Sequence, residues 1–184
     1  MAWDDVRTDG EVLMAAEWNA VIDEISTSRA RAITLMAAGA IQTETYYAEL
    51  DSTQTGALIN YIYGIYPEST ARLQWVTVMP TQWDEGNITP TACWTSTRVG
   101  GSVKWSLTAR RFADGGALTN TLAAGSTFDA DTSAGSRYQE ITGSAFTPTG
   151  SGNFVVFEMT RDFDNDTLIG NARLIAIRLQ YNVS

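Results

Sequence analysis

The sequence contains no histidine, and this absence excludes several kinds of site at once. Catalytic triads that use an imidazole base need this residue, and so do zinc sites with imidazole ligands. The single cysteine, Cys93, has no second cysteine with which to form an intramolecular disulfide. Without a histidine partner, we expect Cys93 to be a small buried apolar side chain rather than a nucleophile.

Lysine is nearly absent, because Lys104 is the one lysine among 12 basic residues and the others are arginines. The formal net charge is -9, and such a surface repels phosphate backbones, so we predict no nucleic-acid partner. Arginine without lysine favours planar, bidentate ion pairs at interfaces. No apolar run approaches the about 18 residues of a membrane span, and no signal peptide is recognisable. We therefore expect no membrane partner and synthesis in a cytoplasm.

The chain changes character near residue 40. Before residue 40, apolar side chains recur at the spacing of an amphipathic helix. This helical spacing is interrupted after Ile25 and resumes between Ala32 and Gly39. The apolar stripe consists of Trp18, Val21, Ile22 and Ile25. We predict an N-terminal helical arm for oligomerisation over residues 1–40 and a β domain over residues 41–184.

From residue 41 onward the pattern is that of β-strands separated by turn-forming residues. Residues 103–110 and 173–181 alternate apolar and polar side chains most regularly, with Ile175 and Ile177 expected to face inward. Further strands are predicted at 42–50, 57–66, 73–79, 91–97, 138–141 and 153–160. About eight antiparallel strands without an intervening helical period predict a mainly β fold, an antiparallel jelly roll or β-sandwich.

Two of these strands, 57–66 and 73–79, carry apolar side chains on both faces. In the second strand Trp75 lies on the face opposite Val76 and Val78. A strand that is apolar on both faces is covered on both faces, so we expect the arm or a neighbouring subunit to lie against it. The predicted interface residues are Trp18, Val21, Ile22, Ile25, Tyr61, Tyr63 and Trp75.

The stretch 161–167, RDFDNDT, is the most site-like motif of the sequence. Its aspartates, spaced like the first ligands of a calcium loop, are Asp162, Asp164 and Asp166. However, Thr167 stands where an EF-hand has glycine, and Arg173 stands where the closing glutamate belongs. We predict a structural turn between two strands, with a weak calcium site and contact with a partner's arginines as alternatives. No cofactor is predicted.

Two further candidate sites involve carbohydrate. Glu158 and Asp162 could be the carboxylate pair of a glycoside hydrolase, but their positions on a strand and its following loop do not make them converge. We therefore predict no enzymatic activity. Exposed aromatic rings could instead stack on sugars, and the alternative interpretation places the same rings in a core or an interface. The candidate rings are Tyr46, Tyr47, Trp83 and Trp94.

Three stretches taken in order resemble small structural proteins of tailed viruses of bacteria and archaea. They are the opening MAWDDVRTDGEVLMAAEWNAVIDEI, the middle SVKWSLTARRFADGGAL and the end FVVFEMTRDFDNDTLIGNARLIAIRLQY. In such proteins a capped helix with Glu-Trp-Asn precedes a jelly-roll domain. Here Met14 stands where a Ser or Thr cap is usual before Glu17, and Asp9 would cap the helix instead.

The resemblance implies a virion component: a head-decorating or cement protein, or a collar or tail part. It further implies a symmetric homo-oligomer, expected to be a trimer, with the major capsid or other virion proteins as partners. No catalytic residue is implied. The alternative function is that of a glycan- or receptor-binding module in a viral tail appendage. We expect the protein in the virion, after synthesis in the host cytoplasm.

Overall fold

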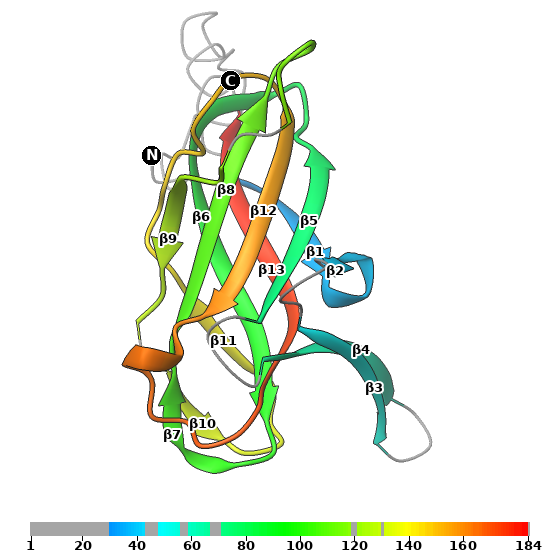
Figure 1. The fold of residues 1–184 in the computed structure, drawn as a ribbon, viewed down its shortest axis with the longest axis vertical. Coiled ribbons are helices and arrows are strands. Elements are labelled where there is room, and N and C mark those ends of the chain that lie inside the picture. The colour runs from blue at the N-terminus through cyan, green and yellow to red at the C-terminus, as the bar shows by residue number, and fades with distance from the viewer. Residues whose placement is uncertain are drawn as a thin grey trace, which may run out of the picture.

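The computed structural model describes residues 30–42, 48–55, 59–66, 71–118, 121–129 and 131–183, with the backbone alone at 53–55, 59–62 and 124. The described residues form antiparallel strands and short 3-10 helices (Figure 1). The strands are β1 (Arg31–Met36), β2 (Ile41–Gln42), β3 (Glu49–Thr55), β4 (Ile59–Tyr66), β5 (Arg72–Val78), β6 (Trp83–Ser96), β7 (Val99–Val103), β8 (Trp105–Phe112), β9 (Ala124–Thr127), β10 (Asp131–Ala134), β11 (Gln139–Thr142), β12 (Phe154–Arg161) and β13 (Ala172–Val183). The 3-10 helices are η1 (Ala37–Gly39) and η2 (Phe163–Asn165).

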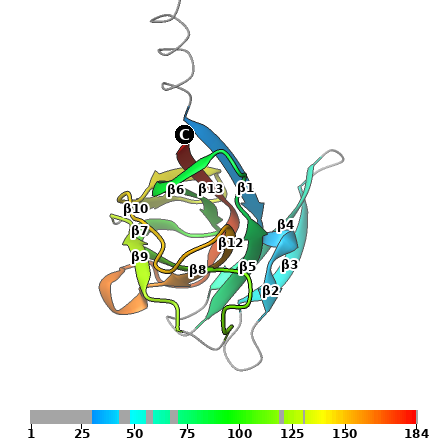
Figure 2. The ribbon, with the colours of Figure 1, turned by 90° about the horizontal axis from the view of Figure 1, so that it is seen from above.

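Two sheets pack face to face (Figures 1 and 2). Sheet A has six strands in the order β11-β6-β13-β4-β3, and β1 pairs with β13 beside β4. Sheet B has five strands in the order β2-β5-β12-β8-β9, and β7 and β10 form a separate pair. The predicted fold class, a mainly β antiparallel sandwich, is confirmed. It contains more strands than the eight or so that the sequence predicts.

The core lies between the sheets and is built mainly from the side chains that alternate inward along the strands. Trp105 and Leu107 of β8 are 0% exposed, as the sequence pattern predicts for strand 103–110. Tyr66 and Trp94 of sheet A pack edge-on against Trp105, with ring centroids 5.0 and 6.4 Å away. These contacts between large rings of the two sheets help to determine the relative orientation of the sheets.

The N-terminal helical prediction is wrong for residues 32–36, because residues 31–36 form strand β1. β1 pairs with β13 along its whole length, and Leu35 turns inward to the core. A strand that completes the edge of a sheet gains a ladder of hydrogen bonds, which outweighs the local helical spacing of its apolar residues. The chain then crosses through η1 to β2, which pairs with β5 of sheet B. Residues 1–29 of the predicted arm lie outside the described residues.

Strand β13 departs from the predicted alternation at one place. The register between β13 and β6 shifts between Leu174 and Ala176, which is a β-bulge. Leu174 is therefore 0% exposed, whereas Ile175, predicted to face inward, is only half-buried. Beyond the bulge Ile177 is buried, as predicted. In the part of the chain that the structure describes, no helix is long and apolar enough to span a membrane.

Candidate functional site

The motif RDFDNDT is built around a buried arginine. Arg161 ends β12 with 1% of its surface exposed, and its guanidinium donates to both carboxylate oxygens of Asp166. It also donates to the backbone carbonyl oxygens of Tyr66, Leu168 and Gly170. One side chain thus ties β4, β12 and the loop before β13 together. The carboxylate of Asp166 meets an arginine of its own chain rather than of a partner.

The three aspartates of this motif have separate roles. Asp162 accepts hydrogen bonds from the side-chain amide of Asn165 at 2.9 and 3.1 Å, which closes the turn around η2. Asp164 is exposed, and Asp166 is held by Arg161. Among the residues with described positions, no group of three or more carboxylate or thiol side chains could hold a metal ion. The motif forms a turn between β12 and β13 that the Asp162–Asn165 hydrogen bonds close.

The hydrolase candidates Glu158 and Asp162 belong to different hydrogen-bond networks. Glu158 points to the outer face of sheet B and is 9% exposed. Its two carboxylate oxygens accept from Gln74 at 2.7 Å and from Arg72 at 3.3 Å. Asp162 bonds to Asn165 instead. The structure therefore does not assemble these carboxylates into a pair that flanks a bond.

The two tryptophans named as candidates for stacking on a sugar are buried. Trp83 is 3% exposed and lies under the guanidinium of Arg111, at 4.8 Å from the ring centroid. Trp94 is 0% exposed, and its indole N–H donates to Asp131 at 2.8 Å. The core interpretation is correct for both tryptophans. Tyr46 and Tyr47 lie outside the described residues.

The predicted interface residues that are described lie inside the chain. Trp75 is 2% exposed in the core, and its indole N–H donates to the carbonyl oxygen of Met36. Tyr63 is 2% exposed, with Arg173 over its ring at 4.7 Å. Neither is therefore available to a partner, because packing within the chain takes up both side chains. Trp18, Val21, Ile22, Ile25 and the side chain of Tyr61 lie outside the description.

An apolar surface does exist on the outside of sheet B, opposite the face that holds Trp75. We call it the apolar face, and it consists of Val76, Val78, Phe112, Leu118, Phe154 and Val156. Phe154 stands between Val78 and Phe112 in the register of neighbouring strands, and Val156 stands beside Val76. Val76 is 45% exposed and Val78 69% exposed.

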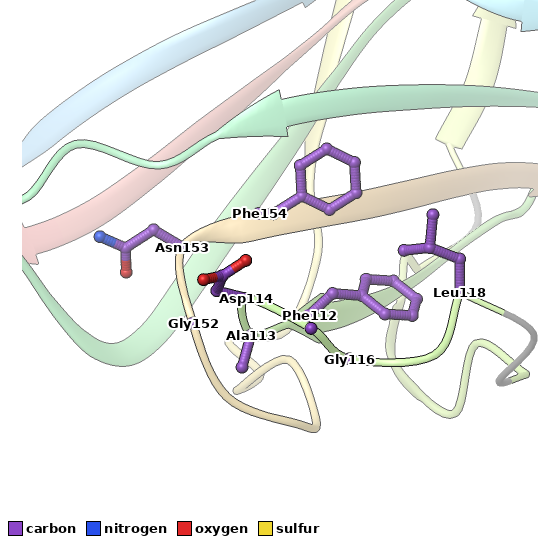
Figure 3. A pocket seen from close by; sticks show the side chains of 9 residues that line it. Phe112, Ala113, Asp114, Gly116, Leu118, Gly152, Asn153 and Phe154 are labelled. Carbon is purple, nitrogen blue, oxygen red and sulfur yellow. The ribbon is translucent and has the colours of Figure 1, made fainter.

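The apolar face runs into a shallow hollow at the end of the sandwich where β8 ends and β12 begins (Figure 3). The hollow has a volume of about 450 Å³ and lies between the loops at 113–118 and 152–153. Phe112 and Phe154 meet edge-to-face with centroids 6.1 Å apart, and Leu118 is 68% exposed. Asp114 supplies a charged group to the lining. The hollow continues the apolar face, since Phe112, Phe154 and Leu118 belong to both.

The outer face of sheet A has a different character. We call the part of it near edge strand β11 the tyrosine platform, made of Cys93, Tyr138, Glu140 and Arg178. Tyr138 is 60% exposed, and its hydroxyl donates to Glu140 and lies 3.2 Å from the sulfur of Cys93. Burial raises the pKa of the Cys93 thiol, and desolvation with hydrogen bonds to Cys93 and Glu140 raises the pKa of Tyr138 far above its usual value. Both groups are therefore neutral at physiological pH.

Comparisons with known proteins give no family for this chain. No family model matches the sequence, and no curated protein matches it. Three of the solved structures to which this chain is similar are carbohydrate-binding modules. The CBM36-1 domain of a multidomain xylanase from the hindgut metagenome of Trinervitermes trinervoides has a TM-score of 0.48 and 9% identity, covering 81% of this chain and 96% of that one.

Two further modules give similar values. The C-terminal CBM6 of the laminarinase LamC from Zobellia galactanivorans has a TM-score of 0.46 and 10% identity over 81% of this chain and 98% of that one. The module CBM6cm-2 of Cellvibrio mixtus lichenase 5A, in complex with cellotriose, has a TM-score of 0.39 and 15% identity over 83% of this chain and 97% of that one. What this chain has in common with these structures is the β-sandwich.

Proposed function

We propose that the protein is a non-enzymatic structural component of a virion, a head-decorating, collar or tail part, that assembles with copies of itself through the apolar face. The observation that carries the proposal is the exposure of Val76, Val78 and Leu118 around a pair of phenylalanine rings. Contiguous exposed apolar surface of this kind is typical of protein contacts. The resemblance of three sequence stretches to virion proteins supports the proposal that this assembly belongs to a virion.

The charge of the chain favours this face for contact between copies. Each copy carries a formal net charge of -9, so two copies repel each other over most of their surfaces. Among the described residues, the charged neighbours of the apolar face include Arg110, which stands beside Val156, and Asp114 in the hollow. Glu158 follows Val156 on the same side of β12, where it is paired with Arg72. Association there removes apolar side chains from water without bringing many carboxylates together. Because the resemblance to virion proteins implies a three-fold oligomer, we propose a trimer as the closed form.

The mass of the purified chain in solution tests this proposal. Size-exclusion chromatography with light scattering, from nanomolar to tens of micromolar, should show a mass that rises to a fixed multiple of the monomer mass. The full chain should also co-sediment with capsids or tails of its virus. A chain that stays monomeric at micromolar concentration and does not bind capsids or tails contradicts the proposal.

The second candidate function is glycan binding by a module of a viral tail appendage. Trp83 and Trp94 do not support this function, because their rings are buried and offer no surface to a sugar. One observation favours it, namely the exposed ring of Tyr138 beside the charged groups of Glu140 and Arg178. An aromatic face next to hydrogen-bonding groups is a surface that suits a sugar, which has one apolar face and many hydroxyls.

A further inference from the structure

The tyrosine platform holds an aromatic ring in a fixed position on the surface. The hydroxyl of Tyr138 is anchored by the Glu140 carboxylate and lies against the sulfur of Cys93, which is 7% exposed. The ring itself remains 60% exposed. An exposed aromatic residue usually loses rotamer freedom when it binds a ligand, and here the anchored hydroxyl has already removed part of that freedom.

The charged groups of the platform lie beside this ring and are paired with each other. Glu140 stands directly opposite Cys93 in the register of β11 and β6. A guanidinium nitrogen of Arg178 lies 3.3 Å from the second Glu140 carboxylate oxygen, and both side chains are more than a third exposed, at 46% and 38%. The pair thus presents a charged acceptor and planar donors to solvent, without net charge.

The strands on either side extend this polar surface. Arg178 stands opposite Thr91 on β6, and Thr91 stands opposite Thr142 on β11. The hydroxyl oxygens of these two threonines lie 3.1 Å apart. Gln180 is exposed two positions further along β13 than Arg178. These side chains, which can both donate and accept hydrogen bonds, continue the polar surface along the strands beyond Glu140 and Arg178.

We propose that the tyrosine platform is a binding site for a neutral glycan. One sugar ring stacks its C–H face on Tyr138, and neighbouring hydroxyls of that sugar donate to Glu140 and accept from Arg178. A neutral sugar fits because the Glu140–Arg178 pair carries no net charge, and because the acidic chain as a whole disfavours acidic sugars and phosphates. The inference rests on the second candidate function and is independent of assembly through the apolar face.

The test uses the full chain on an array of neutral and acidic oligosaccharides, followed by calorimetric titration with the neutral glycan that gives the strongest signal. We expect Tyr138→Ala to weaken binding of that glycan about tenfold or more, since the stacking surface is lost. Tyr138→Phe keeps the ring and should stay within about threefold of the wild type. Arg178→Gln should weaken binding by a factor between these two.

Two control variants show whether the effect belongs to this site. Phe163→Ala removes another exposed aromatic ring, which is 44% exposed on η2, and should leave glycan affinity unchanged. Val78→Glu changes the opposite side of the sandwich and should also leave it unchanged. Thermal melts of all variants confirm that each one is folded at the temperature of the titration.

The outcomes separate the site from the function. If no neutral glycan binds the wild-type chain, both the second candidate function and this site are overturned. If a neutral glycan binds and Tyr138→Ala leaves its affinity unchanged, glycan binding stands and the tyrosine platform is the wrong site. Binding that is confined to acidic glycans overturns the proposed ligand class.

Discussion

Replacing Arg161 with methionine should destabilise the fold more than most single substitutions. The side chains of Arg161 and Asp166 are 0% and 2% exposed, so the variant leaves a buried carboxylate without its cation. Breaking a buried ion pair by removing one partner costs about 3–5 kcal/mol. The carbonyl oxygens of Tyr66, Leu168 and Gly170 also lose a donor, while methionine keeps most of the apolar stem packed. We expect a loss of about 3–5 kcal/mol, a large part of the about 5–15 kcal/mol that stabilises a typical domain.

Urea unfolding of the wild type, Arg161→Met, Asp166→Asn and the double variant measures this effect. The double-mutant cycle should give a coupling energy of about 1–3 kcal/mol, because the two side chains share one network. The double variant should therefore be more stable than the sum of the single changes predicts. If Arg161→Met lowers the free energy of unfolding by less than about 1 kcal/mol, the role given to this arginine is wrong.

Three further predictions concern packing, thiol chemistry and metal binding. Gly64→Ala should cost about 1–3 kcal/mol in urea unfolding, because the added Cβ would lie 2.4 Å from a Leu73 methyl carbon, whereas Gly39→Ala, with nothing within 4 Å, should cost far less. Since burial raises the pKa of Cys93, its thiolate fraction at pH 8 is below that of free cysteine. Its reaction with an aromatic disulfide reagent should therefore be slower than that of free cysteine, faster as the pH rises, and accelerated by Tyr138→Ala; equal rates for protein and free cysteine contradict the assigned burial. The melting temperature should be unchanged by millimolar calcium or chelator, and a calcium-dependent rise would reopen the metal hypothesis for RDFDNDT.

The strands that the sequence predicts well are those with strict alternation and β-branched or aromatic side chains, such as β8 and β12. The strands that it misses are short or rich in small residues, such as β7 with its two glycines and β9 with the sequence AGST. These segments are strands because long-range pairing places them beside β10 and β8, and not because of their own propensity. The first half of β6 is also hard to predict as a strand. It begins with Trp-Asp-Glu-Gly-Asn, and these residue types are typical of a turn.

The candidate surfaces were predictable to different degrees. Apolar side chains on both faces of 73–79 correctly indicate an apolar outer surface, but the pattern does not say which face is the core. The bulky Trp75 belongs to the core, and the smaller valines opposite it form the surface. The tyrosine platform has no sequence signal, because Cys93, Tyr138 and Arg178 come from separate parts of the chain. They meet only through the pairing of β6 with β11 and β13.

Sedimentation equilibrium of a matched pair of variants tests the assembly proposal most directly. Val78 and Val99 are both exposed valines on strands, at 69% and 83%, but Val99 lies on β7, away from the apolar face. We predict that Val78→Glu is monomeric at concentrations where the wild type and Val99→Glu share one oligomeric mass, with all three equally folded. A wild-type oligomer that survives Val78→Glu unchanged would contradict assembly through the apolar face.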